Sequence, residues 1–350
     1  MSAEKMARRF RDQAAACANL GSPMYAALLE RVAGDIEAGG VTRSVLAGHE
    51  EDPGPSALAL RLAGSVHRLV LSGDADELAA YYPSAGGVWD PEAGWEAFRR
   101  LLRDHADRVR EWLDRPPQTN EVGRAAALMG GLLQIGEVVD HPVRLFEIGS
   151  SGGLNLNADR FAYTDQDDRV FGDETARLVL RRAWQGRPLR PWPNLRITER
   201  LGSDYRPVDV ATAEGRLTLS SYVWPDQTER LDRLREAFAV AAEHPVEVRR
   251  TDARSFVDDL ALADGATTVL WHSVMWQYLP PEDRDAIRDR IEALGASATE
   301  SRVFAHLLLE PLRRTPGSEH EFLAVLEVWP GGERRILGTA PGHGVPVTWE

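Results

Sequence analysis

The chain has 350 residues, of which 43% are hydrophobic, enough for a large core and about two domains. No apolar run approaches the roughly 18 residues of a membrane span, and the first residues lack a secretory signal, so we expect a cytoplasmic protein. The net charge of −13, without a basic block, argues against nucleic acid as a partner. The lack of an apolar span argues against a membrane as a partner. The single cysteine, Cys17, excludes an intramolecular disulfide and a multi-cysteine metal site.

The N-terminal third has the pattern of helices separated by loops rich in Gly, Pro and Asp. Ser22-Pro23 is typical of a helix start, and Gly39-Gly40 ends the helical spacing that follows. Two further helices are predicted over residues 56–71 and 95–113. We therefore expect an all-α cap domain over residues 1–118.

From residue 119 the pattern changes to alternating helices and strands. Thr119 or Asn120 is expected to cap a helix that runs to Val139. Strands are predicted over residues 143–148, 195–204, 246–253, 267–276 and 302–311. Helices are predicted over residues 155–163, 225–243 (with Pro225 at the first helical position) and 281–295. Residues 322–329 and 334–340 flank a PGGE turn and predict a β-hairpin.

The alternation predicts an α/β fold with a doubly wound, mostly parallel, Rossmann-like sheet and a terminal antiparallel hairpin, preceded by the all-α region. We assign this second domain to residues 119–350. Residues 164–194 interrupt the alternation and are interpreted as an insertion, with a short hairpin around residues 169–184.

The segment VRLFEIGSSGGLNL, residues 143–156, is the most informative in the chain. A strand ends in Glu147, and a turn of small residues leads into a helix: Gly149, Ser150, Ser151, Gly152 and Gly153. Such a turn lets a nucleotide-like ligand approach the main chain and exposes N–H groups at the helix start. The carboxylate of Glu147 suits hydroxyls or a cation better than phosphate, which favours an adenosyl group with a positive charge.

Polar side chains also follow the other predicted strands. Ligands of open parallel sheets bind where the carboxyl ends of the strands meet. The residues at these ends are Asp204, Asp252-Ala253, His272-Ser273 and Glu310, with Trp276 and Tyr278 just beyond.

These residues resemble the core of class I S-adenosylmethionine-dependent methyltransferases. Glu147, Gly149 and Gly153 match the acid and glycine turn of that family, Asp204 with Pro207 matches the acid after its second strand, and Asp252-Ala253 matches the pair after its third. Ser151 replaces the middle glycine, and Asp204 follows the turn by about 50 residues instead of about 20. The whole chain, with QTNEVGR and SYVWPDQ, also resembles a bacterial family of unknown function built on this core.

The resemblance implies S-adenosylmethionine as the cofactor. It places residues 149–153 against the methionine part, Glu147 near its ammonium group and Asp204 at the ribose hydroxyls. It also implies that Asp252 contacts the adenine amino group and that Ala253 lies beside the adenine ring. Ser273 would line the cofactor near the reacting methyl group.

Methyl transfer needs a base only when the acceptor carries a proton. His272 is the first candidate, because histidine exchanges protons near neutral pH, and Glu310 is the second. The candidate substrate contacts are Gln118, Asn120, Glu121, Arg124, Trp276 and Tyr278. No HExxH motif occurs, so no metal site is expected.

The sequence thus predicts methyl transfer to a small molecule, and no oligomeric state follows from it. Two alternatives remain open: a non-catalytic nucleotide-binding or scaffold protein on the same fold, and an NAD-dependent oxidoreductase.

Overall fold

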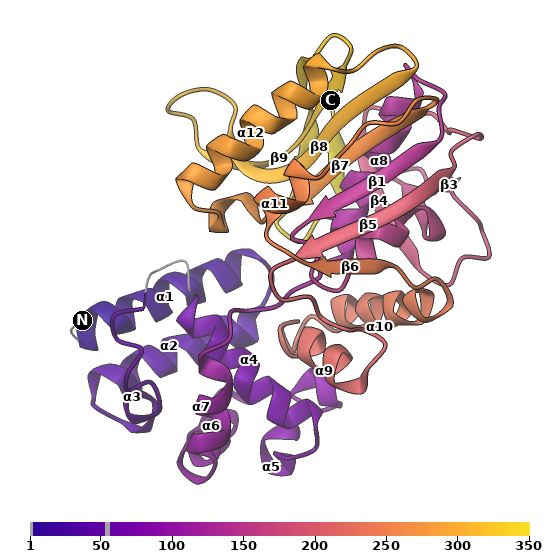
Figure 1. Cartoon of the computed structure of the whole chain (residues 1–350). Coiled ribbons are helices and arrows are strands. Elements are labelled where there is room, and N and C mark those ends of the chain that lie inside the picture. The colour runs from indigo at the N-terminus through magenta and orange to yellow at the C-terminus, as the bar shows by residue number, and fades with distance from the viewer. Residues whose placement is uncertain (1–2, 53–56) are drawn as a thin grey trace. The chain divides into compact units, whose positions relative to one another are not determined.

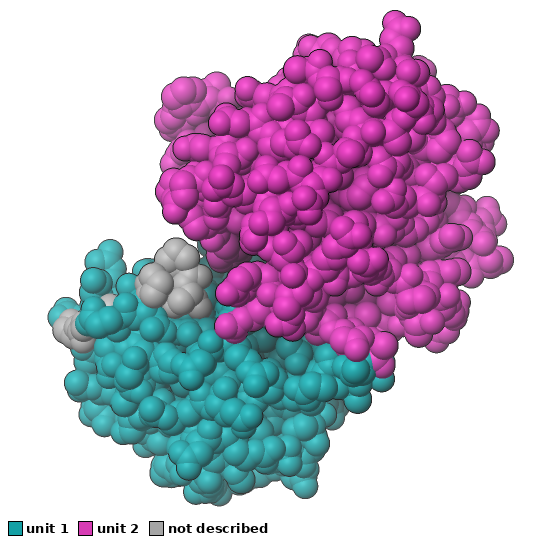
Figure 2. Space-filling model, viewed as in Figure 1, with its two compact units in different colours: residues 1–119, 212–232 teal, residues 120–211, 233–350 magenta. Residues whose placement is uncertain are grey.

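The computed structural model describes residues 3–52 and 57–350, which form two compact units (Figure 1 and Figure 2). Unit 1 comprises Met1–Thr119 and Thr212–Asp232, and unit 2 comprises Asn120–Ala211 and Arg233–Glu350. Sequence analysis had placed residues 212–232 with the α/β domain. Among the described residues, no helix has the length and apolar character needed to cross a membrane.

The part of unit 1 that the structure describes is helical and contains no strand. Its helices are α1 (Ala3–Asn19), α2 (Pro23–Glu37), α3 (Val41–Val45), α4 (Leu58–Leu71), α5 (Asp76–Ala79), η2 (Pro83–Ala85), α6 (Pro91–Asp104), α7 (Ala106–Leu113) and α9 (Ala213–Ser221). The single helix predicted over residues 95–113 is wrong: the chain leaves helical geometry at His105 (φ −129°), which separates α6 from α7. The helix predicted over residues 56–71 is α4, and Ser56 lies outside the described residues.

The predicted start of α2 is confirmed, and a distant carboxylate reinforces it. Ser22 Oγ accepts a hydrogen bond from the Tyr25 N–H and donates to Asp226 Oδ1 at 2.6 Å, while Asp226 Oδ2 accepts from the Met24 N–H at 2.9 Å. The prediction of Pro225 as a first helical residue is wrong, because α10 (Thr228–Glu243) starts only after this capping aspartate.

Unit 2 is built on an eleven-stranded sheet in the order β3-β2-β4-β11-β10-β9-β8-β7-β1-β5-β6. The strands are β1 (Val143–Ile148), β2 (Ala162–Asp165), β3 (Val170–Phe171), β4 (Val179–Gly186), β5 (Ile197–Asp204), β6 (Glu247–Arg250), β7 (Ala266–Ser273), β8 (Arg302–Arg313), β9 (His320–Trp329), β10 (Glu333–Ala340) and β11 (Val347–Trp349). Six of its ten neighbouring pairs are parallel, so the predicted mostly parallel α/β sheet is confirmed. The predicted hairpin is confirmed as β9 and β10, which pair antiparallel.

Residues 162–186 extend this sheet. The predicted hairpin around residues 169–184 is wrong, because β3 pairs antiparallel with β2 while β4 runs parallel to both β2 and β11. Stacking of Tyr163 on Trp184, with ring centroids 4.9 Å apart, buries both side chains and favours the β2–β4 pairing. The predicted helix over residues 155–163 is also wrong: a 3₁₀ helix, η4 (Leu154–Arg160), is followed directly by β2.

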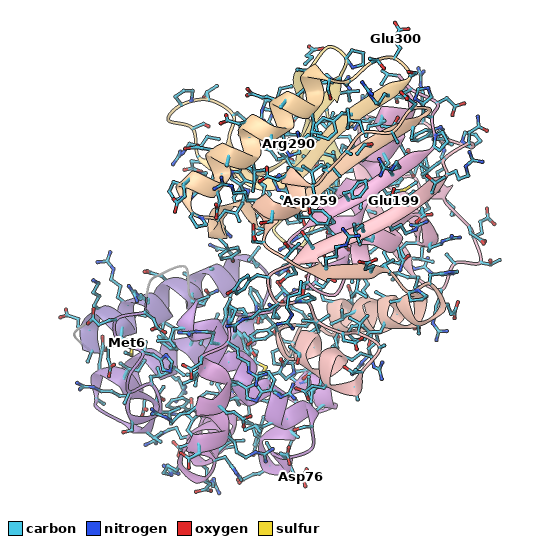
Figure 3. All side chains as sticks on the ribbon, viewed as in Figure 1. Met6, Asp76, Glu199, Asp259, Arg290 and Glu300 are labelled. Atoms are coloured by element: carbon cyan, nitrogen blue, oxygen red, sulfur yellow. The ribbon has the colours of Figure 1, made fainter. Side chains whose placement is uncertain are left out.

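Helices cover both faces of the sheet (Figure 1). On one face lies α8 (Ala125–Gly136), where a Cβ on Gly131 would stand 2.4 Å from Leu307 of β8. On the other lie α11 (Ala253–Asp258) and α12 (Pro281–Ala296), and Arg290 of α12 (Figure 3) donates to the Leu260 carbonyl at 2.7 Å. Since adjacent side chains of a strand alternate between faces, each strand residue can be assigned to the α8 face or the α12 face.

The helix predicted from residue 120 begins later. A short 3₁₀ turn, η3 (Val122–Arg124), precedes α8, and Glu121 caps that turn by accepting the Gly123 N–H at 3.2 Å. Asn120 is therefore not the cap of this helix, because its side chain is engaged elsewhere in unit 2.

Candidate functional site

The carboxyl ends of five parallel strands meet at one edge of unit 2, here called the carboxyl edge. Glu147 of β1 lies opposite Gly202 of β5 and Trp271 of β7. Asp204 at the end of β5 lies opposite Arg250, and Asp252 follows two residues later. The structure thus brings the three predicted strand-end acids to the same edge.

Glu147 is buried at this edge. Its Oε1 accepts a hydrogen bond from Trp271 Nε1 at 3.1 Å, while Oε2 is buried and has no hydrogen-bond partner within the described parts of the chain. Burial raises the pKa of the Glu147 carboxyl to about 8, and the charge of Asp204 adds to the effect, whereas Trp271 and Arg124 oppose it. At neutral pH the carboxyl is therefore mostly protonated, and a nearby cation would favour its ionised form.

The turn after β1 adopts left-handed backbone conformations at three positions. The φ angles are +68° at Gly149, +55° at Ser151 and +71° at Gly153. Residue 153 also has no room for a side chain, because a Cβ there would lie 2.7 Å from Val248. Ser151, where the methyltransferase pattern has glycine, adopts the left-handed conformation that glycine accepts most easily.

Asp204 closes this turn from β5. Its Oδ2 accepts the Ser151 N–H at 2.9 Å and its Oδ1 accepts the Arg206 N–H at 2.8 Å. The carboxylate remains partly exposed, so its second lone pairs are still available to hydroxyl donors.

Asn120 closes the same turn from the other side. Its Oδ1 accepts the N–H groups of Gly152 at 3.2 Å and Leu154 at 3.0 Å. The N–H groups of Ser150 and Gly153 donate to main-chain carbonyls at 3.0 and 2.8 Å. Every N–H from residue 150 to residue 154 is thus bonded within the protein, which corrects the expectation of exposed N–H groups at a helix start.

Asp252 and Ala253 follow β6 as predicted, but Asp252 caps a helix. Its carboxylate accepts both the N–H and the hydroxyl of Ser255 at 2.8 Å, so it is the N-cap of α11. The Ser255 N–H holds the pKa of the Asp252 carboxyl below its usual value. Asp252 is exposed, while Ala253 is buried beneath it.

Glu147 and His272 lie on opposite faces of the sheet. Trp271 bonds to Glu147, and its chain neighbour His272 must point the other way. His272 Nδ1 lies 2.8 Å from Glu310 Oε1 on the α12 face, and its ring stacks on Trp276 with centroids 5.0 Å apart. The two predicted catalytic residues therefore contact each other but not Glu147.

Glu310 holds the segment that follows β7. Its Oε1 accepts the N–H groups of Met275 at 3.0 Å and Trp276 at 3.3 Å, at the start of η5 (Trp276–Tyr278). Met275 in turn packs against Gly149, where a Cβ would lie 2.9 Å from Met275 Cβ. The His272–Glu310 pair thus positions the residues that lie against the glycine turn.

The remaining predicted residues of unit 2 lie around this edge. Arg124 donates to the Ser273 carbonyl at 3.4 Å, and the Glu121 carbonyl accepts Asn155 Nδ2 at 3.3 Å. Tyr278 is 60% exposed, and Gln118 belongs to unit 1. Among the described residues, no three His, Cys, Asp or Glu side chains are grouped as metal ligands.

Sequence reasoning missed three residues that build this region. Trp271 was treated as a strand residue, although an indole N–H next to a buried acid is a strong donor. His306 and Glu327 occupy apolar strands β8 and β9, where a polar residue inside an apolar run is the available signal.

A family model described as "uncharacterized protein conserved in bacteria (DUF2332)" matches residues 7–349. The chain belongs to this family. No curated protein and no solved structure matches it. The family description names no ligand, so the chemistry of the carboxyl edge rests on the residues themselves.

Proposed function

We propose that unit 2 binds S-adenosylmethionine at the carboxyl edge and transfers its methyl group to a small molecule. The strand order supports this: β6-β5-β1-β7-β8 has the first strand in the middle, and the order reverses between β1 and β7. Doubly wound Rossmann-like sheets bind adenosine-containing ligands at such a switch point. Glu147 and the glycine turn lie at the end of β1, beside this point.

The main-chain N–H groups of the glycine turn are already hydrogen-bonded within the protein, which favours a cofactor without a pyrophosphate. Dinucleotide sites present free main-chain N–H groups, at the start of a helix, to the two phosphates. Here Asp204 and Asn120 occupy the turn N–H groups, and the following element is a short 3₁₀ helix. These contacts count against the NAD-dependent alternative.

The buried Oε2 of Glu147 is the observation that carries the proposal. An unpaired carboxyl oxygen in a buried position is costly unless a ligand completes it. The ammonium group of the methionine part would supply both a donor and a positive charge, and the partly exposed Asp204 would accept ribose hydroxyls. Three groups of the chain thus fit the cofactor: one acid for the cation, one acid for hydroxyls and a turn that accepts no phosphate.

The bound sulfonium supplies a methyl group that is already activated. The chain then needs mainly to align the acceptor with that group. Met275, which packs against Gly149, and the adjacent Trp276 are both held by Glu310 and are suited to orient an acceptor there. We assign His272 and Glu310 a positioning role in this proposal, because Glu310 bonds both to His272 and to this segment.

Thermal unfolding with four ligands tests the proposal. We expect S-adenosylmethionine and S-adenosylhomocysteine, but not NAD or ATP, to stabilise the chain, by about 2.7 kcal/mol at a hundred times Kd. Glu147→Gln should weaken this stabilisation, whereas Glu199→Gln, at a half-buried position of β5 where Glu199 pairs with Arg144 (Figure 3), should leave it unchanged. Stabilisation by NAD alone would favour an oxidoreductase. The absence of any stabilisation, or binding without methyl transfer to any acceptor, would favour the scaffold alternative.

A further inference from the structure

Four buried titratable side chains form a line across β7, β8 and β9, on the α12 face. His272 Nδ1 lies 2.8 Å from Glu310 Oε1, and His272 Nε2 lies 3.1 Å from His306 Nε2. His306 Nδ1 lies 3.5 Å from Glu327 Oε2. Their side chains are between 0 and 7% exposed.

The Glu327 end carries a permanent charge. Arg334 Nη1 donates to Glu327 Oε1 at 2.7 Å, and Arg288 Nη1 of α12 lies 3.3 Å from Oε2. Burial acts to raise the pKa of the Glu327 carboxyl, but the pKa is lowered overall, and Arg334 and Arg288 are among the causes. This carboxylate therefore stays ionised and can accept a proton donor but does not itself hold a proton.

Two atoms of the line are buried without a hydrogen-bond partner among the described residues. They are His306 Nδ1, which faces Glu327, and Glu310 Oε2. Glu310 Oε1 faces three donors: His272 Nδ1 and the N–H groups of Met275 and Trp276.

We assign the resting protons from the hydrogen-bond partners, since either ring nitrogen of a neutral histidine can carry the proton. His272 Nδ1–H donates to the Glu310 carboxylate, so a neutral His272 has a bare Nε2. The proton between the two rings must then belong to His306 Nε2, which leaves His306 Nδ1 bare. A bare nitrogen opposite a carboxylate makes no hydrogen bond, which explains both the 3.5 Å separation and the absence of a partner. Burial lowers the pKa of His306 to about 4, so this ring is neutral at pH 7.

We infer that these four residues form a proton relay that sets the charge of Glu310 and, through it, the hold on the Met275–Trp276 segment. A proton binds His306 Nδ1 and hydrogen-bonds to Glu327. The Nε2 proton of His306 moves to His272 Nε2, and the Nδ1 proton of His272 moves to Glu310 Oε1. One proton enters, both rings stay neutral in the opposite tautomer, and the Glu310 carboxylate becomes an uncharged acid.

The charge of Glu310 matters because of what it holds. Hydrogen bonds to an ionised acceptor are roughly twice as strong as those to a neutral one. Neutralising Glu310 therefore weakens its bonds to the N–H groups of Met275 and Trp276, and this segment packs against Gly149 of the glycine turn. The other groups that contact the relay are Trp276 on η5, Arg288 on α12 and Arg334 on β10. The inference does not depend on the methyl transfer proposed above.

Nitrogen NMR of the full chain with labelled histidines tests the relay. At pH 8 we expect the Nδ1–H tautomer for His272 and the Nε2–H tautomer for His306. On acidification both rings should change tautomer with one shared midpoint, and the infrared C=O stretch of a protonated carboxylic acid should appear at the same pH. The protection factor of the Trp276 amide, which corrects for the intrinsic pH dependence of exchange, should then fall about tenfold or more.

Glu310→Gln serves as the matched variant, because glutamine keeps an acceptor for the Met275 and Trp276 N–H groups but cannot take up the proton. It should abolish both the joint tautomer change and the infrared band. His67, a buried histidine of unit 1 that bonds to the Ser221 carbonyl and Ser84, is the internal control and should keep its own titration in the variant. A His306 that becomes doubly protonated while His272 keeps its Nδ1 proton would overturn the relay, as would two separate midpoints. These wild-type outcomes decide the question even if the variant does not fold.

Discussion

Trp271 Nε1 donates to Glu147 Oε1 at 3.1 Å across two neighbouring parallel strands, and this is the one hydrogen bond that the buried carboxyl receives among those found in the described structure. The bond selects Oε1 and leaves Oε2 unpaired. It also fixes Glu147 on the α8 face, opposite His272. The acid at the end of β1 is thus separated by the sheet from the histidine that sequence analysis considered as a base.

Glu147→Gln is expected to remove a pH-dependent loss of stability. The folded-state pKa of about 8 lies above the usual value of 4.5, so between these pH values the folded chain keeps a proton that the unfolded chain releases. The unfolding free energy of the wild type should therefore fall as pH rises from about 4.5 to 8, by up to about 1.4 kcal/mol per pH unit. Denaturant unfolding at pH 5 to 9 measures this. Curves of equal slope for the two proteins would contradict the prediction.

Asn120→Ala should destabilise unit 2. It leaves the N–H groups of Gly152 and Leu154 without their acceptor, and each unsatisfied buried donor costs about 1–3 kcal/mol. Asn120→Asp keeps an acceptor oxygen and should cost less. Asn194→Ala, at an exposed position that bonds to Asp140, is the control and should change stability by less than about 1 kcal/mol. Equal denaturation midpoints for the Asn120 and Asn194 variants would refute the role of Asn120.

The parallel strands and the acids at their ends could be predicted because both signals are local. Buried strands show as short apolar runs, and each run here stops at a polar or small residue. The hydrogen-bond partners of those acids could not be predicted. An aspartate that accepts from the residues next to it and one that accepts from a turn 53 positions away look the same in the sequence. Asn120 illustrates this: a helix cap and a cap for a distant turn need the same side chain, and only the fold decides between them.

The omission of β2 and the wrong pairing predicted for residues 169–184 have a different reason. The strands of residues 162–186 are short, and β4 carries two adjacent arginines, so neither apolar runs nor strict alternation marks them. Their stability comes from tertiary packing, above all from Tyr163 on Trp184 and from Trp184 Nε1 bonded to the Ala126 carbonyl of α8. Single-sequence patterns carry no information about such contacts.

Gly153→Ala should cost more than Gly265→Ala. The two glycines have nearly the same backbone, with φ of +71° and +72°, so both pay about 1–2 kcal/mol for left-handed strain. A Cβ on Gly153 would also collide with Val248 and Val246, at 2.7 and 2.9 Å, while a Cβ on Gly265 meets nothing within 4 Å. The difference between the two unfolding free energies isolates the steric part. Equal losses of unfolding free energy in the two variants would show that Val246 and Val248 move aside at no cost and that the turn tolerates a side chain.

Asp226→Ala should weaken unit 1 at the start of α2. The substitution removes the acceptor of the Met24 N–H and of the Ser22 hydroxyl, and the helix start keeps only the Ser22 cap of Tyr25. Loss of a helix cap costs about 0.5–2 kcal/mol, and two bonds are lost here. Hydrogen exchange should become faster at the Met24 amide, while Asp76→Ala, at an exposed position of α5 (Figure 3), should leave that amide unchanged. Since residue 226 is two hundred positions away in sequence, faster exchange at Met24 would demonstrate that residues 212–232 complete the helical unit, and unchanged exchange would separate them from it.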